Sequence, residues 1–582
     1  MFMMARDKWM GVTCACLAVL LYVNTLHHGY ALDDYPTIYG NRLTMAGVRA
    51  IPAMLHTGYW YGLDGMNDWL YRPLSLVIFA LEWQIAPGSP ALGHWINVIL
   101  YALTAVVLFR FLRDLFVGYD PMVPFAIALL WIAHPLHTEV VANIKSRDEL
   151  LAFLFSMLAV WRCVTYVSAP RKKHLVLSGV YFFLALMSKE SAITFLVIVP
   201  MTLFVFRRPD SKTMLRAVVP IGIAAGVYLV IRSSVLTSQI GGGAISLIDN
   251  SLTAAPDFVH RQATAFYIGG MYLRLLFFPH PMSSDYSFRQ IPIVGFDNPI
   301  AMGSLLLYVG LLIYGAIRLP KREPVAYGIL FYLISMALVA NVLFLTRSTM
   351  ADRFLYAPSL GFCIMLVFLL ARALRLDPTA PHVGRPWSAN PAFAGVVALL
   401  LVASALLTWA RNPDWKNDTT LFAADSRHSP NSARVHFLYG NHMLQELKQN
   451  KVPPSRQDED YEIALAEFRR AIALYPAYAE PHMGIGDAFT YRRDFPSAVR
   501  WYTDIVARNP RFVAGYVSLG NTFVSMKDYA SAIAAFQKAV AIDPNDAGAN
   551  YLLGSAFRAR GDSVRGKEYL GKAYRLDPRM RQ

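Results

Sequence analysis

Two adjacent carboxylates, Asp33 and Asp34, directly follow the first apolar stretch of the chain. Adjacent side chains in an extended segment point to opposite sides, so the two are not an acid–base pair that faces one substrate. One of them could act as a general base while the other holds a helix end or an arginine. The alternative interpretation is a helix stop and a turn before Pro36.

A second polar cluster lies between two apolar stretches and contains both cations and carboxylates. It reads His134-Pro135-Leu136-His137-Thr138-Glu139 and then Lys145-Ser146-Arg147-Asp148-Glu149. A His-x-x-His-x-Glu spacing invites a metal site, but Pro135 and the helix end argue against a regular ligand face, and we expect no metal. Arg147 is the better candidate for binding, because a guanidinium matches phosphate oxygens bidentately. The alternative is an arginine that only extends to the membrane interface.

Two further polar clusters interrupt apolar stretches later in the chain. One is Lys189-Glu190, for which phosphate binding and an internal salt bridge both stay open. The other, for which a structural network is the alternative, contains Arg347, Asp352, Arg353 and Tyr356, and could be joined by His280, Asp285 and Tyr286. Ionisable groups near membrane depth are costly and mark functional sites. Together, these groups suit transfer from an anionic lipid-linked donor, with cations on the leaving phosphate and a carboxylate as the base.

The elements that must position these clusters are apolar helices. Hydrophobic residues make up 55% of the 582 residues and charged residues only 16%, which is typical of a membrane protein. The net charge of +15 falls largely in loops beside apolar stretches, and without a nucleic-acid motif it indicates no nucleic-acid partner. No disulfide framework is indicated, since every cysteine lies in an apolar stretch: Cys14, Cys16, Cys163 and Cys363.

We expect about eleven membrane spans. The first, near 10–27, follows basic residues, lacks a small-residue cleavage site and is expected to stay as an anchor. The others are expected near 94–112, 122–141, 149–167, 175–188, 191–206, 214–232, 299–318, 324–345, 357–373 and 391–410. If residues 29–93 lie on the outer face of the membrane, the basic loops all lie on the opposite face. Segments 72–86 and 262–278 are then interfacial helices, and the C-terminal part lies outside with the loops 29–93 and 233–298.

The C-terminal part carries an internal repeat. Prolines recur every 34 residues, and glycines, small residues and large residues recur in phase with them: Pro476, Pro510, Pro544 and Pro578; Gly486, Gly520 and Gly554; Ala498, Ala532 and Gly566; Tyr502, Phe536 and Leu570. This is the signature of tetratricopeptide (TPR) repeats. An earlier unit with an inserted loop around 449–458 brings the number to about four. Asp487 and Asn521 are expected to face a groove for an acceptor peptide, with a solvated groove or an assembly contact as alternatives.

In their order along nearly the whole chain, these motifs resemble the TMTC family, the transmembrane and tetratricopeptide-repeat O-mannosyltransferases. The resemblance rests on Ala31-Leu32-Asp33-Asp34, His134-Pro135-Leu136-His137-Thr138-Glu139, Ser146-Arg147-Asp148-Glu149-Leu150-Leu151, Ser188-Lys189-Glu190, Ser284-Asp285-Tyr286-Ser287, Ala351-Asp352-Arg353-Phe354-Leu355-Tyr356-Ala357-Pro358-Ser359-Leu360-Gly361-Phe362 and Arg411-Asn412-Pro413-Asp414-Trp415.

The resemblance implies an all-α architecture. A polytopic GT-C-type glycosyltransferase domain would occupy residues 1–411, a linker 412–429 and the TPR domain 430–582, and interfacial helices of the first outer loop would cap a membrane cavity. The implied reaction is an inverting transfer of a sugar from a polyprenyl- or dolichyl-phosphate donor to Ser or Thr hydroxyls of a protein. No cofactor or metal is implied.

The resemblance also implies roles for single residues. The general base is Asp33 or Asp34, with Asp34 slightly favoured. Arg147, Lys189 and Arg353 contact the donor phosphate. The remaining residues shape the site: His137, Glu139, Asp148, Glu190, Asp285 and Tyr286.

The short repeat array departs from the longer arrays of animal relatives, so the acceptor differs or the repeats only brace the membrane domain. Compact loops fit a bacterial inner-membrane enzyme with its site on the periplasmic side, or the lumenal face of the ER membrane if eukaryotic. Two other functions stay open: an O-antigen-ligase-like transferase that uses pyrophosphate-linked glycans, and a non-enzymatic TPR scaffold or transporter.

Overall fold

The computed structural model describes residues 2–63, 69–237, 245–376 and 390–581, and these fold entirely into helices and their connections, which confirms the all-α prediction. The chain divides into a membrane unit, Met1–Ser287 with Ile291–His428, and a repeat unit, Phe288–Gln290 with Ser429–Gln582. Most of the segment predicted as a linker is helical and belongs to the membrane unit.

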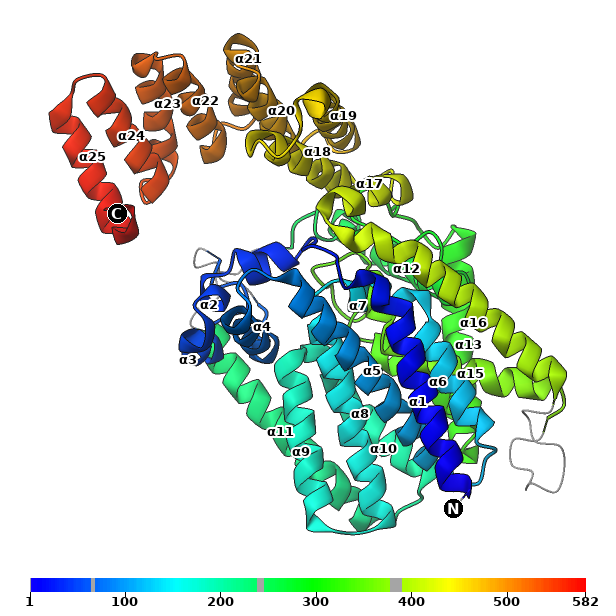
Figure 1. The fold of residues 1–582 in the computed structure, drawn as a ribbon. Coiled ribbons are helices and arrows are strands. Elements are labelled where there is room, and N and C mark those ends of the chain that lie inside the picture. The colour runs from blue at the N-terminus through cyan, green and yellow to red at the C-terminus, as the bar shows by residue number, and fades with distance from the viewer. Residues whose placement is uncertain (1, 64–68, 238–244, 377–389, 582) are drawn as a thin grey trace. The chain divides into compact units, whose positions relative to one another are not determined.

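The membrane unit is built from long helices joined by short helical turns (Figure 1). Its α-helices are α1 (Phe2–Tyr22), α2 (Arg42–Met45), α3 (Ile51–Leu55), α4 (Pro73–Ile85), α5 (Pro90–Leu115), α6 (Met122–Ala133), α7 (Thr138–Ala142), α8 (Arg147–Ser168), α9 (Lys172–Ser188), α10 (Phe195–Phe206), α11 (Ser211–Thr237), α12 (Phe258–Phe277), α13 (Pro299–Arg318), α14 (Pro324–Met336), α15 (Pro358–Ala373), α16 (Pro391–Arg411) and α17 (Asp418–His428). The short turns that matter for the site are η4 (Pro135–His137), η5 (Glu190–Thr194) and η8 (Asp352–Leu355).

In the described part of the chain, six helices are long and apolar enough to cross a membrane: α1, α5, α8, α11, α13 and α16. A seventh is present if α6, η4 and α7, which bend by 53°, form one broken span. The predicted count of about eleven is not confirmed, because α10, α14 and α15 have only 12, 13 and 16 residues. A straight crossing needs about 20 residues. The span predicted at 324–345 ends at Met336.

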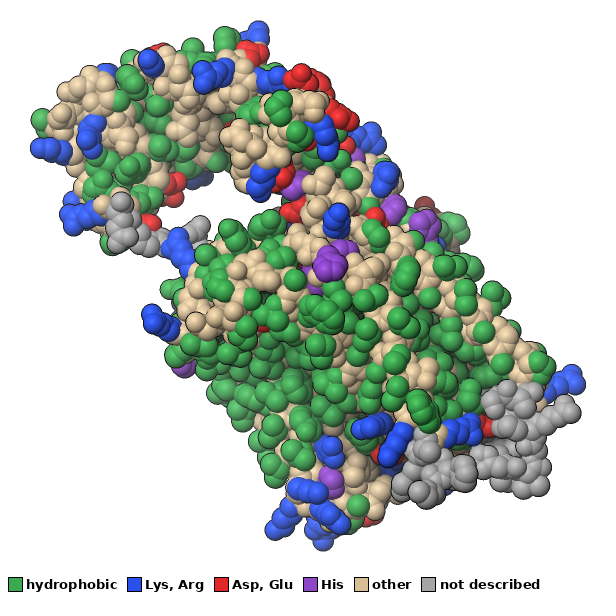
Figure 2. All heavy atoms as spheres, in the orientation of Figure 1, with side chains coloured by type: hydrophobic (Ala, Val, Ile, Leu, Met, Phe, Trp, Pro, Cys, Tyr) green, Lys and Arg blue, Asp and Glu red, His purple; other side chains and the backbone are tan. Residues whose placement is uncertain are grey.

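The surface of the membrane unit separates apolar from basic side chains. Figure 2 shows hydrophobic side chains over the flanks of its helices and Lys and Arg side chains gathered at the end where the N-terminus of α1 lies. Large apolar side chains on these flanks are exposed, such as Leu306, Leu399 and Val230 at 65%, 69% and 68%. Exposed apolar area of this extent indicates contact with lipid.

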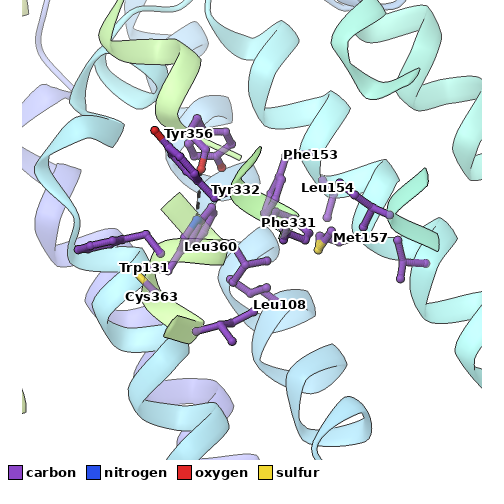
Figure 3. Packing of buried hydrophobic residues seen from close by; sticks show 14 of the residues in the cluster. Leu108, Trp131, Phe153, Leu154, Met157, Phe331, Tyr332, Tyr356, Leu360 and Cys363 are labelled. Carbon is purple, nitrogen blue, oxygen red and sulfur yellow. Dashed lines mark hydrogen bonds between the residues drawn. The ribbon is translucent and has the colours of Figure 1, made fainter. Parts of the chain in front are cut away.

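A buried aromatic cluster holds the helix ends that carry the polar clusters. Trp131 of α6 stacks on Phe153 of α8, with ring centroids 5.0 Å apart, and packs against Tyr356, which precedes α15, at 5.2 Å. The indole N–H of Trp131 donates to the Tyr356 carbonyl (3.3 Å; Figure 3). Three elements that are distant in the sequence are thereby fixed beneath one site.

The repeat unit contains four helix pairs, which confirms the predicted TPR repeats. They are α18 (Ala433–Lys448) with α19 (Gln457–Leu474), α20 (Ala479–Tyr491) with α21 (Phe495–Arg508), α22 (Val513–Ser525) with α23 (Tyr529–Ile542), and α24 (Ala547–Ala559) with α25 (Ser563–Leu576).

Close packing of the two helices within each pair explains the 34-residue period. A Cβ on Gly486 would lie 2.5 Å from the Tyr502 ring, and a Cβ on Gly520 would lie 2.5 Å from the Phe536 ring. Only glycine lets the two helices of a pair approach this closely. The repeated glycine and the repeated large residue are therefore one contact.

Candidate functional site

Asp34 is fully buried in the segment after α1. Its Oδ2 accepts a hydrogen bond from the Ala31 N–H (3.0 Å) and its Oδ1 accepts one from the Lys145 N–H (2.7 Å). Burial raises the pKa of Asp34 to about 7, although both donors favour the carboxylate. The Oδ1 atom thus holds the turn before α8 against the segment that follows α1, and the Oδ2 atom stabilises that segment itself.

Asp33 has the opposite environment. Its side chain is 40% exposed, and its Oδ2 lies 3.8 Å from Lys145 Nζ. Its charge also acts on the guanidinium of Arg353. A general base needs an accessible oxygen before it needs a suitable pKa. The geometry therefore favours Asp33 over Asp34, which the sequence slightly favoured.

Arg147 lies in the interior and not at an open surface. Its Nε donates to Asn97 Oδ1 (2.7 Å), its Nη2 donates to the Gly93 carbonyl (2.9 Å), and its Nη1 pairs with Glu82. The guanidinium also lies over the Phe79 ring, 4.8 Å from the centroid. All three nitrogens fasten α8 to α4 and α5, so the structure gives Arg147 a bracing position and no free face toward a substrate.

A narrow cavity of about 40 Å³ opens between α8, η5, the end of α14 and η8. Its polar lining includes Lys189, Arg353 and the hydroxyls of Ser191 and Thr194. The Oγ of Ser156, also in the lining, is buried and has no hydrogen-bond partner among the described residues. Aromatic and aliphatic side chains complete the wall: Phe153, Phe195, Phe354 and Val339. The cavity thus combines cations and hydroxyls with an apolar wall.

Each of the two cations in this cavity is held by one carboxylate. Lys189 Nζ lies 2.5 Å from Glu149 Oε1, and Arg353 Nη1 pairs with Glu139, whose Oε2 also accepts the Arg353 backbone N–H (3.0 Å). An ammonium has three donors and a guanidinium five, so both cations have further donors for an anion. Their carboxylate partners set the positions of the two cations.

A network of ion pairs continues from the cavity toward the loop between α1 and α5. Arg72 Nη1 contacts Asp148 Oδ2 (2.7 Å), and its Nε and Nη2 contact both oxygens of Glu190 (2.8 and 2.5 Å). Asp148 also lies 3.6 Å from Lys145 Nζ, which reaches Asp33. Asp148 and Glu190 therefore belong to the network around the predicted base, and Arg72 ties them to the start of α4.

His137 is fully buried beneath the site. Its Nδ1 hydrogen-bonds the Tyr101 hydroxyl (2.9 Å) and its Nε2 the Ser359 hydroxyl (3.0 Å). Both ring nitrogens are thus used within the protein. Among the described residues, no group of three or more His, Cys, Asp or Glu side chains is arranged to hold a metal ion.

Asp285 and Tyr286 belong to a second network. The Tyr286 hydroxyl donates to Asp352 Oδ1 (2.9 Å), and the Ser283 N–H donates to Asp352 Oδ2 (3.1 Å). Asp285 Oδ2 accepts the Ser287 N–H (2.9 Å). This network shapes the loop after α12 and reaches the cavity through Asp352, the neighbour of Arg353.

The two residues predicted to face an acceptor lie in the repeat unit, on the first helices of successive pairs. Asp487 of α20 pairs with Lys448 Nζ (2.8 Å) and with the Tyr502 hydroxyl. Asn521 of α22 is exposed. Arg347, from the fourth cluster, lies over the Trp69 ring, with the guanidinium 5.5 Å from the centroid.

Lys145, Glu149 and Arg72 are central to the site but were not among the residues singled out. Lys145 and Glu149 belong to the second polar cluster of the sequence, and they differ from Arg147 in the neighbours that their side chains reach. The backbone at Lys145 is held by Asp34, a contact across more than a hundred residues. No local signal marked Arg72.

Comparisons with known proteins agree with this organisation. The families “TPR repeat” and “Tetratricopeptide repeat” match residues 520–561 and 456–511. Protein O-mannosyl-transferase TMTC3 of Homo sapiens is 24% identical over 518 residues, 82% of this chain and 52% of that protein. TMTC4 of Mus musculus is 24% identical (76% of this chain, 65% of that protein), and TMTC1 of Homo sapiens 26% (84% and 57%).

The chain therefore spans about half to two thirds of the length of these relatives. The predicted resemblance to the TMTC family is confirmed. Among solved structures, “Crystal structure of MamA” is 18% identical, with a TM-score of 0.23, and covers 30% of this chain and 92% of that chain.

Proposed function

We propose that this chain is a membrane glycosyltransferase that moves a sugar from a polyprenyl-phosphate donor to Ser or Thr hydroxyls of a protein. The observation that carries the proposal is a solvent-accessible carboxylate, Asp33, whose charge acts on Arg353, a cation that lines the cavity together with Lys189. The names of the relatives, protein O-mannosyl-transferases, support the same reaction class. Mannose is accordingly the first sugar to test.

In this proposal the cavity receives the phosphate of the donor. Lys189 and Arg353 would stabilise the negative charge that develops on the leaving lipid phosphate. Ser191, Thr194 and the unpartnered Oγ of Ser156 would supply neutral hydrogen bonds. Arg147 is not assigned to the phosphate, because its side chain is fully buried among α4, α5 and α8 and does not line the cavity.

The reaction needs one base and no covalent intermediate. The acceptor hydroxyl oxygen attacks the anomeric carbon of the donor, and the bond from that carbon to the phosphate oxygen breaks. The hydroxyl proton passes to Asp33, and the lipid phosphate leaves as the anion. A single displacement of this kind inverts the anomeric configuration. Lys145, 3.8 Å from Asp33, would keep the base in position.

The proposed location is a membrane with the site on the face opposite the basic loops. That face is periplasmic in a bacterium and lumenal in the ER membrane. Figure 2 shows a cluster of Lys and Arg side chains at the end of the membrane unit where α1 begins, as the positive-inside rule expects of the cytoplasmic side. The repeats would bind the acceptor protein through residues such as Asp487 and Asn521.

The test is sugar transfer by the purified full-length protein. Polyprenyl-phosphate mannose, glucose and N-acetylglucosamine are offered in turn with a Ser/Thr-rich secreted protein, and the product is read by mass spectrometry. We expect Asp33→Asn to lower the rate by about 10²–10⁴-fold. Asp297→Asn, which alters an exposed carboxylate in the loop before α13, is the matched control and keeps full activity.

Three outcomes would contradict the proposal. Full activity of Asp33→Asn removes Asp33 as the base. Transfer only from pyrophosphate-linked glycans assigns the chain to ligase-type enzymes. If no donor is consumed even by slow hydrolysis, the chain is a scaffold or transporter.

A further inference from the structure

Four aromatic side chains form a continuous row that begins beside Asp33. Tyr30 packs against Tyr35 and Tyr35 against Tyr39, with ring centroids 6.0 and 6.1 Å apart. Tyr39 packs in turn against Trp83, at 6.0 Å. Tyr35 and Tyr39 are 44% and 52% exposed. Contiguous exposed rings, unlike single ones, mark an interaction surface, and these four residues are called the aromatic row below.

The first end of the aromatic row and the proposed base belong to one turn. The Asp34 N–H donates to the Ala31 carbonyl (3.1 Å) and closes the tight turn that contains Asp33. Tyr30 and Tyr35, whose rings contact each other, flank this turn in the sequence. Because Asp33 and Tyr35 are two residues apart, their Cα atoms lie within about 7 Å of each other. A peptide whose hydroxyl reaches Asp33 is therefore also within reach of the row.

The two exposed tyrosines are fixed before any ligand binds. They are the ends of η2 (Tyr35–Tyr39), a π-helical turn that the Gly40 N–H closes on the Tyr35 carbonyl (2.7 Å). Thr37, in the middle of this turn, is fully buried. The turn thus buries its centre and presents Tyr35 and Tyr39 outward, and a surface fixed in advance loses less entropy on binding.

The far end of the aromatic row lies away from the lipid-facing side of α4. Leu81 and Ile85, which are 42% and 76% exposed, form the apolar stripe of that helix that suits contact with lipid. Trp83 is two residues from each of them, and residues two apart on an α-helix point about 200° apart. Trp83 therefore meets Tyr39 on the other face of α4. This placement argues against a simple aromatic anchor in the membrane interface.

The spacing and the chemistry of the aromatic row define its ligand. A step of about 6 Å equals two residues of a polyproline-II chain, which rises about 3.1 Å per residue. The rings carry no charge, so a strongly charged segment gains nothing from them. The described residues contain no β-strand, so the row offers no strand edge for a peptide to pair with. Side chains must hold the ligand, and prolines on an already extended chain pack on aromatic rings at small entropic cost.

We propose that the aromatic row binds an extended, proline-containing segment of the acceptor protein, next to the Ser or Thr whose hydroxyl is attacked. The row covers about six residues on one side of that hydroxyl. The inference rests on the proposed function, because it takes Asp33 to be the base. It adds a preference for acceptor sequence that acts beside the site.

The test is binding of a fluorescent peptide to the full-length protein in nanodiscs, measured by fluorescence polarisation without a sugar donor. The peptide has a central threonine with prolines at alternate positions on both sides, and the comparison peptide has alanine in place of every proline. Tyr35→Ala and Tyr39→Ala each remove one ring of the row. Tyr61→Ala, which removes a 41% exposed tyrosine of the same loop outside the row, is the matched control. Asp33→Asn separates binding from transfer.

We expect about five- to tenfold weaker binding of the proline peptide to Tyr35→Ala and Tyr39→Ala, and unchanged binding to Tyr61→Ala and Asp33→Asn. In transfer assays, the two row variants should raise the KM of the proline peptide and leave kcat and the KM of polyprenyl-phosphate mannose unchanged. Unchanged peptide binding by both row variants, or equal binding of the two peptides to the wild type, would overturn the assignment. A raised KM for the donor alone would also overturn it, because the row would then contact the sugar.

The docking surface and the proposed function fail separately in these assays. If the wild type transfers no sugar but binds the proline peptide through the row, the docking surface is supported and the proposed function is refuted. The bound segment then belongs to a binding partner. If Asp33→Asn loses transfer while Tyr35→Ala and Tyr39→Ala bind and transfer like the wild type, the proposed function stands and the docking surface is refuted.

Discussion

At the scale of single residues, Asp33 and Asp34 have separate tasks. Asp34 accepts two backbone N–H groups with its two oxygens, whereas an asparagine offers one acceptor oxygen and turns an NH₂ group toward the other donor. Asp34→Asn should therefore leave one buried N–H unsatisfied and lower the free energy of unfolding by about 1–3 kcal/mol. Asp33→Asn should leave stability nearly unchanged, because partly exposed ion pairs contribute about 0–1 kcal/mol.

The measurement is the thermal midpoint of both purified variants beside their transfer rates. We expect Asp34→Asn to melt earlier, and Asp33→Asn to melt like the wild type while losing activity. The assignment of the two carboxylates is reversed if Asp33→Asn melts early and Asp34→Asn is the stable, inactive variant.

Asp352 makes stability depend on pH. Burial, reinforced by the Glu139 carboxylate, raises its pKa from the ordinary 3.8 to about 8. Between these values the folded protein keeps a proton that the unfolded chain releases, so the contribution of Asp352 to stability is largest at low pH. It is lost as the pH rises through 8, by at most about 1.4 kcal/mol per pH unit.

An uncharged isostere at this position should remove that dependence. The thermal midpoint of Asp352→Asn should fall less than that of the wild type between pH 6 and pH 9, because the amide never ionises. The exposed-site variant Asp297→Asn should follow the wild type. Parallel curves for Asp352→Asn and the wild type would show that Asp352 is already charged in the folded protein.

At the scale of elements, ion pairs fasten the loop between α1 and α5 to the long helices. Arg72, at the start of α4, contacts Asp148 of α8 and Glu190 of η5, and Glu82 at the end of α4 pairs with Arg147. Removing one partner of a fully buried pair costs about 3–5 kcal/mol. The cost of removing Arg72 lies toward the lower end of that range, because Asp148 keeps Lys145 at 3.6 Å and the Glu190 side chain is 37% exposed.

We therefore expect Arg72→Ala to lower the thermal midpoint strongly, whereas Arg49→Ala, at an exposed position of the same loop, should not. Limited proteolysis should cut the loop containing α2, α3 and α4 faster in Arg72→Ala. Resistance equal to that of the wild type would mean that the apolar packing of α4 holds the loop without Arg72.

The repeated helix pairs could be predicted from the sequence, because the same packing contact recurs in each pair. Elements whose ends depend on contacts with distant residues could not. Gly486 and Tyr502 contact each other within one helix pair, so the repeats can be predicted from the sequence alone. The span count cannot, because the apolar sequence continues past Met336 while α14 ends there after 13 residues. Likewise, Arg147 and Lys145 are both cations in one turn. Contacts with distant residues decide which of them reaches Asp33: Asp34 holds the backbone at Lys145, and α4 and α5 hold the side chain of Arg147.

At the scale of the whole molecule, the repeat unit includes three residues from the loop between α12 and α13. The Phe288 carbonyl accepts the Ala433 N–H (2.7 Å), the Arg289 N–H donates to the Asn431 carbonyl (3.0 Å), and the Phe288 ring packs on Tyr475 with centroids 5.0 Å apart. The start of α18 is thus completed by a segment that is distant in the sequence. A fragment cut at residue 429 lacks these contacts.

The fragment 429–582 should still fold as a helical solenoid, because each of its four pairs has its own glycine contact. Joining residues 286–292 to its N-terminus through a flexible linker should raise its melting temperature by about 2–4 °C, as an aromatic pair and two backbone bonds amount to about 1 kcal/mol. Circular dichroism measures both effects, and Phe288→Ala in the joined form should return the midpoint to that of the bare fragment. If the bare fragment has no helical signal, the repeats cannot fold without the membrane unit. If joining the segment changes nothing, residues 288–290 only lie against the solenoid and do not stabilise it.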